Sequence, residues 1–153
     1  MTPQKTPQGT YLVNIQGKDF EFRKWGAEEQ TDTLIDLIAV AGDGLGSIAD
    51  IYKNIGADTD LSEGVIKKMV STFSQGLSRD KAMTKRLLKK LASDRVICDG
   101  ASINYNTFYQ DDLMLSFTVL QANLMVQFGS FLSVVGKFKA AQPAAQMETS
   151  GNA

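Results

Sequence analysis

Alternating hydrophobic residues near the start of the chain predict a β-hairpin. Val13 and Ile15 occupy alternate positions, and Phe20 and Phe22 repeat the pattern after the dipeptide Gly17-Lys18. A glycine in the first position of a two-residue turn is typical of type II′. A turn at this place pairs Ile15 with Phe20 and Val13 with Phe22, so that all four side chains share one face.

A second hairpin is predicted further along the chain. Two apolar runs, Val96 to Cys98 and Ala101 to Ile103, flank the dipeptide Asp99-Gly100. Asp-Gly between apolar runs strongly favours a tight turn, and a turn here pairs Val96 with Ile103. An isolated hairpin is only marginally stable in water, so we expect the two hairpins to join one small antiparallel sheet.

Between the hairpins, hydrophobic residues recur every three or four positions, which is the spacing of amphipathic helices. We expect four such helices. The first has an acidic start at Glu28 and Glu29 and apolar positions over 34–40, and the others lie over residues 48–56, 60–76 and 78–91. The glycine-rich stretch 42–46 ends the first helix, Gly76 ends the third, and Ser78 caps the fourth.

A final helix is predicted from Leu113, and no charged residue occurs between this position and Gly136. A hydrophobic seam runs along it, formed by Leu113, Phe117, Leu120, Leu124, Phe128, Phe131 and Val135. An uncharged polar stripe lies on another face, formed by Ser116, Asn123, Gln127 and Ser130. The segment is also long enough for a membrane span, which needs roughly 20 residues.

Three interpretations of this helix stay open at the level of sequence. It is the central core helix of the domain, an interface helix covered by another chain, or a transmembrane helix. We expect it to pack part of its seam inside the domain and to offer the remainder to a partner helix or to another copy of itself. Hydrophobic side chains left in water favour such association. The polar stripe then faces solvent or forms hydrogen bonds across the interface.

The predicted elements amount to a mainly α fold with two small β-hairpins (α+β). A chain of 153 residues suits one domain, which we place over residues 10–139 as a helical domain with a small antiparallel sheet. We expect residues 1–9 to form a disordered arm, since they are polar and lack the apolar core of a signal peptide. Residues 140–153 are mostly small and polar, and we expect them to be a disordered tail.

The residue types that most catalytic and metal sites need are absent from the sequence. There is no histidine and a single cysteine, Cys98, which excludes histidine-dependent triads, cysteine zinc sites and internal disulfides. The glycine-rich stretch 42–46 lacks the spacing and the preceding strand of a phosphate-binding loop. We therefore expect no enzymatic activity, no cofactor and no metal.

Charged residues nearly balance overall but are separated along the chain. Lys and Arg number 16 and Asp and Glu number 17, and this balance argues against a nucleic-acid partner. Acidic residues dominate from 27 to 63, whereas basic residues dominate from 78 to 95. The two regions either attract each other or form a charged surface that binds a partner protein. The basic candidates for partner binding are Lys85, Arg86, Lys89 and Lys90.

The order of these segments carries a family resemblance. A hairpin that ends in Phe20-Glu21-Phe22-Arg23-Lys24-Trp25-Gly26-Ala27 is followed by an acidic helix, the lysine-rich run Lys85–Leu91 and a second hairpin within Val96–Tyr105. The stretch Asn106–Leu113 then leads into the uncharged helix. Over residues 10–139 this layout resembles the tail assembly chaperones of tailed bacteriophages.

The resemblance implies a non-enzymatic binding function in the host cytoplasm. Such chaperones engage the tape measure protein, mask its apolar helical surface and help to recruit tail tube subunits before the tube polymerises. No catalytic or ligand-binding residue is implied by the family. Two alternatives stay open: a structural component of the phage tail or baseplate that remains in the virion, and a small membrane protein with a single span.

Overall fold

The computed structural model describes residues 2–42 and 63–131 of the chain. Five strands form one antiparallel sheet in the order β1-β2-β3-β4-β5. The strands are β1 (Gln4–Lys5), β2 (Tyr11–Ile15), β3 (Lys18–Phe22), β4 (Ile97–Cys98) and β5 (Ala101–Ser102). The helices are α1 (Ala27–Ala41), α3 (Glu63–Arg79), α4 (Lys81–Ser93), α5 (Tyr105–Phe108) and the helix Leu113–Phe131, which we call the central helix. The predicted α+β fold with a small antiparallel sheet is confirmed.

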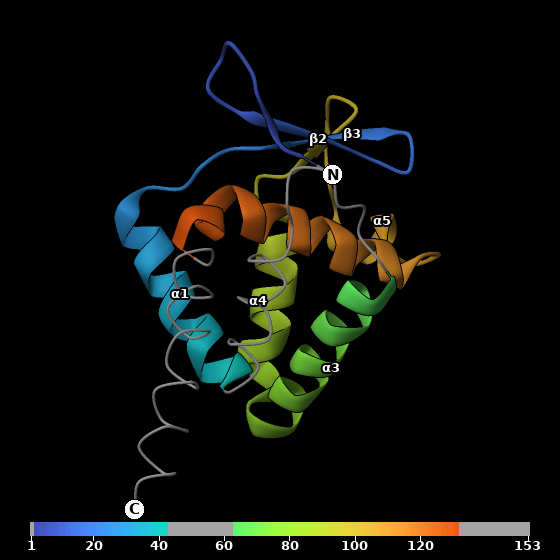
Figure 1. The fold of residues 1–153 in the computed structure, drawn as a ribbon. Coiled ribbons are helices and arrows are strands. Elements are labelled where there is room, and N and C mark those ends of the chain that lie inside the picture. The colour runs from blue at the N-terminus through green and yellow to red at the C-terminus, as the bar shows by residue number, and fades with distance from the viewer. Residues whose placement is uncertain (1, 43–62, 132–153) are drawn as a thin grey trace, which may run out of the picture.

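The central helix crosses the middle of the molecule, between the sheet on one side and α1, α3 and α4 on the other (Figure 1). It therefore meets both layers. The inner face of the sheet contributes Val13, Phe20 and Phe22 to the core. The helices contribute the buried side chains of Leu37, Phe73, Leu87, Leu91, Val119, Leu120 and Leu124.

The first hairpin forms, but its predicted pairing is wrong. The turn lies at Gln16-Gly17, where both residues have positive φ angles of 53° and 78°, the backbone of a type I′ turn. Val13 consequently lies opposite Phe20 rather than Phe22, and Ile15 lies opposite Lys18. A turn displaced by one residue shifts the pairing by two, which leaves every side chain on its original face. The hydrophobic pattern fits both registers equally well.

The second hairpin and its place in the sheet are confirmed. Its turn is Asp99-Gly100, with φ angles of 48° and 83°. The backbone N–H of Ile103 donates to the carbonyl of Val96 at 3.3 Å, as the predicted pairing requires. Cys98 lies opposite Phe20, so β4 pairs with β3 and joins the two hairpins.

Part of the N-terminal segment that we expected to be disordered belongs to the sheet. Gln4 and Lys5 form β1, which pairs with β2. The segment folds back because the N–H of Thr6 donates to the carbonyl of Thr10 at 2.8 Å, and the N–H of Thr10 donates to the hydroxyl of Thr6 at 3.2 Å. These hydrogen bonds fix the polar residues that composition alone assigned to a disordered arm.

Glycines act differently at the ends of α1 and α3. Gly42 ends α1 as predicted, with a φ angle of 51° that favours glycine. Gly76 does not end α3, which continues to Arg79. A Cβ atom at Gly76 would overlap Cγ1 of Val40 on α1. Glycine is therefore required here so that α1 and α3 can approach closely.

Two further expectations about the helices have different outcomes. The predicted helix over 48–56 lies outside the described residues. Ser78 does not cap α4, because it lies within α3. The cap is Asp80, whose carboxylate accepts a hydrogen bond of 3.0 Å from the N–H of Met83, as side chains at this position of a helix commonly do.

Candidate partner-binding surfaces

The hydrophobic seam of the central helix is core in its middle and exposed at its described ends. Leu120, Leu124 and Phe128 are candidates for partner binding in the sequence, but they are buried inside the domain. Their burial leaves them unavailable to a partner. Leu113 and Phe131 are 58% and 44% exposed. The outward seam is therefore smaller than the sequence pattern predicted.

Two other members of the predicted seam complete this picture. Phe117 is half-buried and packs edge-on against Phe73 of α3, with 6.3 Å between the ring centroids. Val135 lies outside the described residues. The central helix is long and apolar enough to cross a membrane, but 67% of its most apolar stretch is buried in the domain. This burial supports the interpretation as a core helix.

The polar stripe of the central helix also points into the domain. Ser116, Asn123 and Gln127 are buried, and only Ser130 is exposed. The amide of Asn123 donates to the carbonyl of Leu91 at 2.9 Å, which ties the central helix to α4. Both roles predicted for the stripe, contact with solvent or with a partner, are therefore wrong for its three buried members.

Gln127 explains why polar residues are needed at this depth. Its side-chain oxygen accepts from the N–H of Trp25 at 2.9 Å, and its side-chain nitrogen donates to the carbonyl of Arg23 at 2.9 Å. The connection from β3 to α1 has left the sheet at this point, so its backbone groups, of which the N–H of Trp25 is buried, require other partners. The glutamine amide supplies both, much as a neighbouring strand would.

The acidic and basic regions face each other across α1 and α4. Arg86 lies 3.4 Å from Asp36, and Lys90 lies 3.3 Å from Glu29. Glu29 also pairs with Arg95, and this hydrogen bond holds the pKa of the Glu29 carboxyl below its usual value. Two of the predicted basic candidates, Arg86 and Lys90, are thus engaged within the domain.

The other two basic candidates, Lys85 and Lys89, are exposed on α4. Neither forms an ion pair with any residue that the structure describes. The structure therefore divides the four predicted residues into an internal pair and an outward pair. The packing of α1 against one side of α4 causes this division. The sequence of α4 alone does not indicate which side α1 covers.

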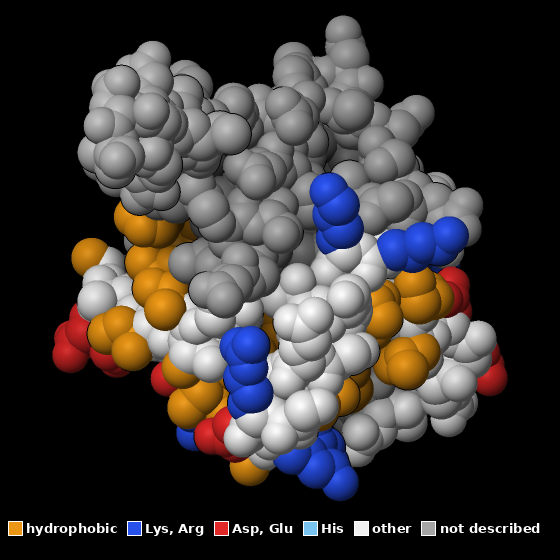
Figure 2. All heavy atoms as spheres, turned by 60° about the horizontal axis from the view of Figure 1, so that its bottom comes forward, with side chains coloured by type: hydrophobic (Ala, Val, Ile, Leu, Met, Phe, Trp, Pro, Cys, Tyr) orange, Lys and Arg blue, Asp and Glu red, His pale blue; other side chains and the backbone are white. Residues whose placement is uncertain are grey.

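Among the residues whose side chains the structure describes, six large hydrophobic ones remain exposed on helices. They are Ile35 and Ile38 on α1, Leu77 on α3, and Leu113, Met114 and Phe131 on the central helix. Figure 2 shows hydrophobic side chains in several patches on one face of the molecule, with lysine and arginine side chains between them. Exposed hydrophobic groups of this kind mark sites of protein interaction when they lie together.

Ile35 and Ile38 are the candidate residues that sequence analysis missed. They are 59% and 45% exposed, three residues apart, and so lie on one outward face of α1. The sequence analysis gave them only as part of the hydrophobic spacing over residues 34–40. The available signal was the number of hydrophobic residues: six of the seven residues over 34–40 are hydrophobic, and one face of a helix cannot bury them all.

The part of the chain that the structure describes contains no cluster of side chains suited to metal binding. No group of three His, Cys, Asp or Glu side chains comes together within residues 2–42 and 63–131. Cys98 is buried, and this burial raises the pKa of its thiol, which disfavours the reactive thiolate.

A known protein family matches the sequence of this chain. The family described as phage tail assembly chaperone protein, TAC, matches residues 16–139, which is most of the chain. The chain belongs to this family, and the resemblance noted in its sequence is confirmed. No curated protein and no solved structure matches the chain. Membership in a chaperone family suggests a non-catalytic role and implies protein partners in tail assembly.

Proposed function

We propose that this chaperone binds the tape measure protein in the host cytoplasm and masks its apolar helical surface until the tail tube assembles around it. It recruits tail tube subunits to the same complex and acts without catalysis. Family membership supports a role in tail assembly. The hydrophobic side chains exposed on α1 and on the central helix support helical partners, because an apolar helix face packs well against another.

The pair Ile35 and Ile38 is the observation that carries this proposal. Each side chain is about half exposed, so a partner that covers both removes a substantial apolar area from water. At the usual value for hydrophobic burial, covering the two half-exposed side chains contributes about 2 kcal/mol. This corresponds to a change of about 30-fold in the dissociation constant.

The test is co-expression of an affinity-tagged chain with the tape measure protein that the same phage encodes. The unmodified chain is expected to keep the tape measure protein soluble and to purify with it. A variant with both Ile35→Ser and Ile38→Ser is expected to lower the purified amount by about 10-fold or more. The matched control is Ala39→Ser, which changes an exposed residue on the same helix face and removes little apolar area.

Circular dichroism separates loss of binding from loss of folding. Both isoleucines are largely outside the core, so the double variant is expected to stay as helical as the unmodified chain. A folded double variant that still purifies with the tape measure protein in unchanged amount would contradict the proposal. Equal loss with Ala39→Ser would also contradict it, because that control leaves the apolar pair intact.

A further inference from the structure

Besides Arg86 and Lys90, helix α4 carries a row of lysines that form no ion pair with any described residue. Lys81, Lys85 and Lys89 follow one another at intervals of four residues, so they lie along one side of the helix over about 12 Å. All three are exposed, and none forms an ion pair with a residue that the structure describes. They differ in this from Arg86 and Lys90, which pair with acidic residues of α1.

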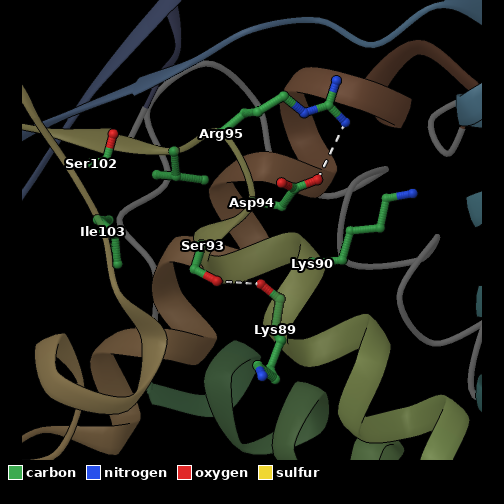
Figure 3. Close-up of a pocket in the computed structure, with 8 residues that line it drawn as sticks. Lys89, Lys90, Ser93, Asp94, Arg95, Ser102 and Ile103 are labelled. Atoms are coloured by element: carbon green, nitrogen blue, oxygen red, sulfur yellow. Dashed lines mark hydrogen bonds and ion pairs between the residues drawn. The ribbon is translucent and has the colours of Figure 1, made fainter.

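This lysine row ends at a hollow of about 540 Å³ between the end of α4 and the second hairpin. Lys89 and Ser93 line it on the side of α4, and Ser102 and Ile103 line it on the side of the hairpin (Figure 3). Asp94 and Arg95 also line the hollow, but Arg95 pairs with Asp94 and with Glu29 of α1, so the cation at the hollow that has no ion pair with a described residue is Lys89. The hollow thus combines positive charge with part of the sheet.

Strand β5 presents an open edge of the sheet at this hollow. Cys98 lies opposite Ala101, and the N–H of Ile103 donates to the carbonyl of Val96. Ser102 stands between these two pairs, and in an antiparallel ladder the backbone groups of such a residue point away from the partner strand. Among the described residues no strand lies on that side of β5. The N–H and carbonyl of Ser102 are therefore directed outward.

We propose that the lysine row and the open edge of β5 form one docking surface for an extended acidic segment of a partner protein. One end of the segment pairs with Ser102 as an added strand, and its carboxylates contact Lys85 and Lys89. Alternate side chains of an extended segment are about 6.8 Å apart, close to the spacing of about 6 Å between successive lysines along α4. This surface is separate from the exposed isoleucines on which the proposed function rests.

Two observations favour a protein segment over a nucleic acid. The hollow contains no aromatic side chain on which a base can stack. An open strand edge offers one N–H donor and one carbonyl acceptor, which match a peptide backbone.

A labelled peptide that alternates glutamate with valine is a suitable probe, with binding measured by fluorescence anisotropy. Replacing both Lys85→Glu and Lys89→Glu is expected to weaken binding by about 10-fold or more, because two attractions become repulsions. The charge-matched control replaces Lys5→Glu and Lys68→Glu, two exposed lysines on β1 and α3. This control is expected to change binding by less than about 2-fold.

The strand edge is tested with Ser102→Pro. Proline removes the outward N–H and leaves the hydrogen bonds of the hairpin in place, so binding is expected to fall by about 5-fold or more while the fold is kept. Ser102→Ala is the matched control, since it removes only the hydroxyl group. Should the proline variant fail to fold, the amide signal of Ser102 in the unmodified chain replaces it, and this signal is expected to shift when the peptide is added.

Several results would overturn the proposal. One is unchanged peptide binding after the two lysine replacements. Another is a folded Ser102→Pro variant that binds the peptide normally. A third is an amide signal of Ser102 that does not shift when the peptide is added. Equal lysine-dependent binding of a short DNA duplex would assign the row to phosphate groups instead. Loss of self-association in the lysine variant would identify the occupant as a second copy of this chain. None of these results depends on the tape measure protein, so they stand apart from the test of the proposed function.

Discussion

Replacing Gln127 by methionine is expected to destabilise the domain strongly, although the two side chains have similar size. Methionine cannot accept from the N–H of Trp25 or donate to the carbonyl of Arg23, and it leaves Oδ1 of Asn123 without its donor at 3.0 Å. The bonds to Trp25 and Asn123 are buried. A buried polar group that loses its partner costs about 1–3 kcal/mol.

The two buried groups together predict a loss of about 3 kcal/mol in the free energy of unfolding, after a small gain from the more apolar side chain. For a domain of this size the same loss lowers the melting temperature by about 6–12 °C. Urea denaturation followed by tryptophan fluorescence is a direct assay. Trp25 is the single tryptophan of the chain and is buried beside this network.

Ser130→Ala is the matched control for the Gln127 variant. Ser130 belongs to the same polar stripe but is exposed, so its replacement is expected to change the free energy of unfolding by less than about 0.5 kcal/mol. A Gln127→Met variant that is as stable as the control would refute the assignment of the stripe to an internal hydrogen-bond network. It would return the stripe to the interface role that the sequence suggested.

Two further predictions concern the helix contacts and the charges. Gly76→Ala is expected to lower the melting temperature, because the added Cβ atom overlaps Val40. Gly129→Ala in the central helix adds a Cβ atom that meets nothing within 4 Å, so it is expected to raise the free energy of unfolding by about 1 kcal/mol. Calorimetry that shows both variants stabilised would contradict this prediction. The pair with Arg95 lowers the folded-state pKa of Glu29 below 4.5, so its stabilisation is present above pH 4.5 and is lost as pH falls through the folded-state pKa. Urea titrations at several pH values are expected to show a smaller acid-induced loss for Glu29→Gln than for the unmodified chain, and equal losses would show that the pair contributes nothing.

The sequence was most informative where structure depends on a few neighbouring residues. The Asp99-Gly100 turn and its pairing, the segment that becomes α1, and the start of the central helix at Leu113 all follow from local signals. The register of the first hairpin did not, because two adjacent turn positions place Val13 and Phe20 on the same face. Only the positive φ angle at Gln16 distinguishes the two registers, and this residue is not a glycine.

Exposure depends on neighbours that are distant in the sequence, and the candidate surfaces were therefore harder to predict. Gln127 resembled a surface residue on a helical projection, yet its backbone partners Trp25 and Arg23 lie about a hundred positions earlier in the chain. Ile35 resembled a core residue, yet no described element covers it. Lys89 and Lys90 are adjacent in sequence, and only the position of α1 decides that Lys90 is paired.

Site-specific photo-crosslinking in the complex with the tape measure protein tests the central claim most directly. A photoreactive amino acid in place of Ile35 is expected to crosslink to the tape measure protein, because this side chain lies on the exposed hydrophobic face of α1. The same amino acid in place of Gln16, which is also exposed and lies at the tip of the first hairpin, is expected to give no crosslink. Crosslinks from Gln16 with none from Ile35 would contradict the account and place the binding surface on the sheet instead.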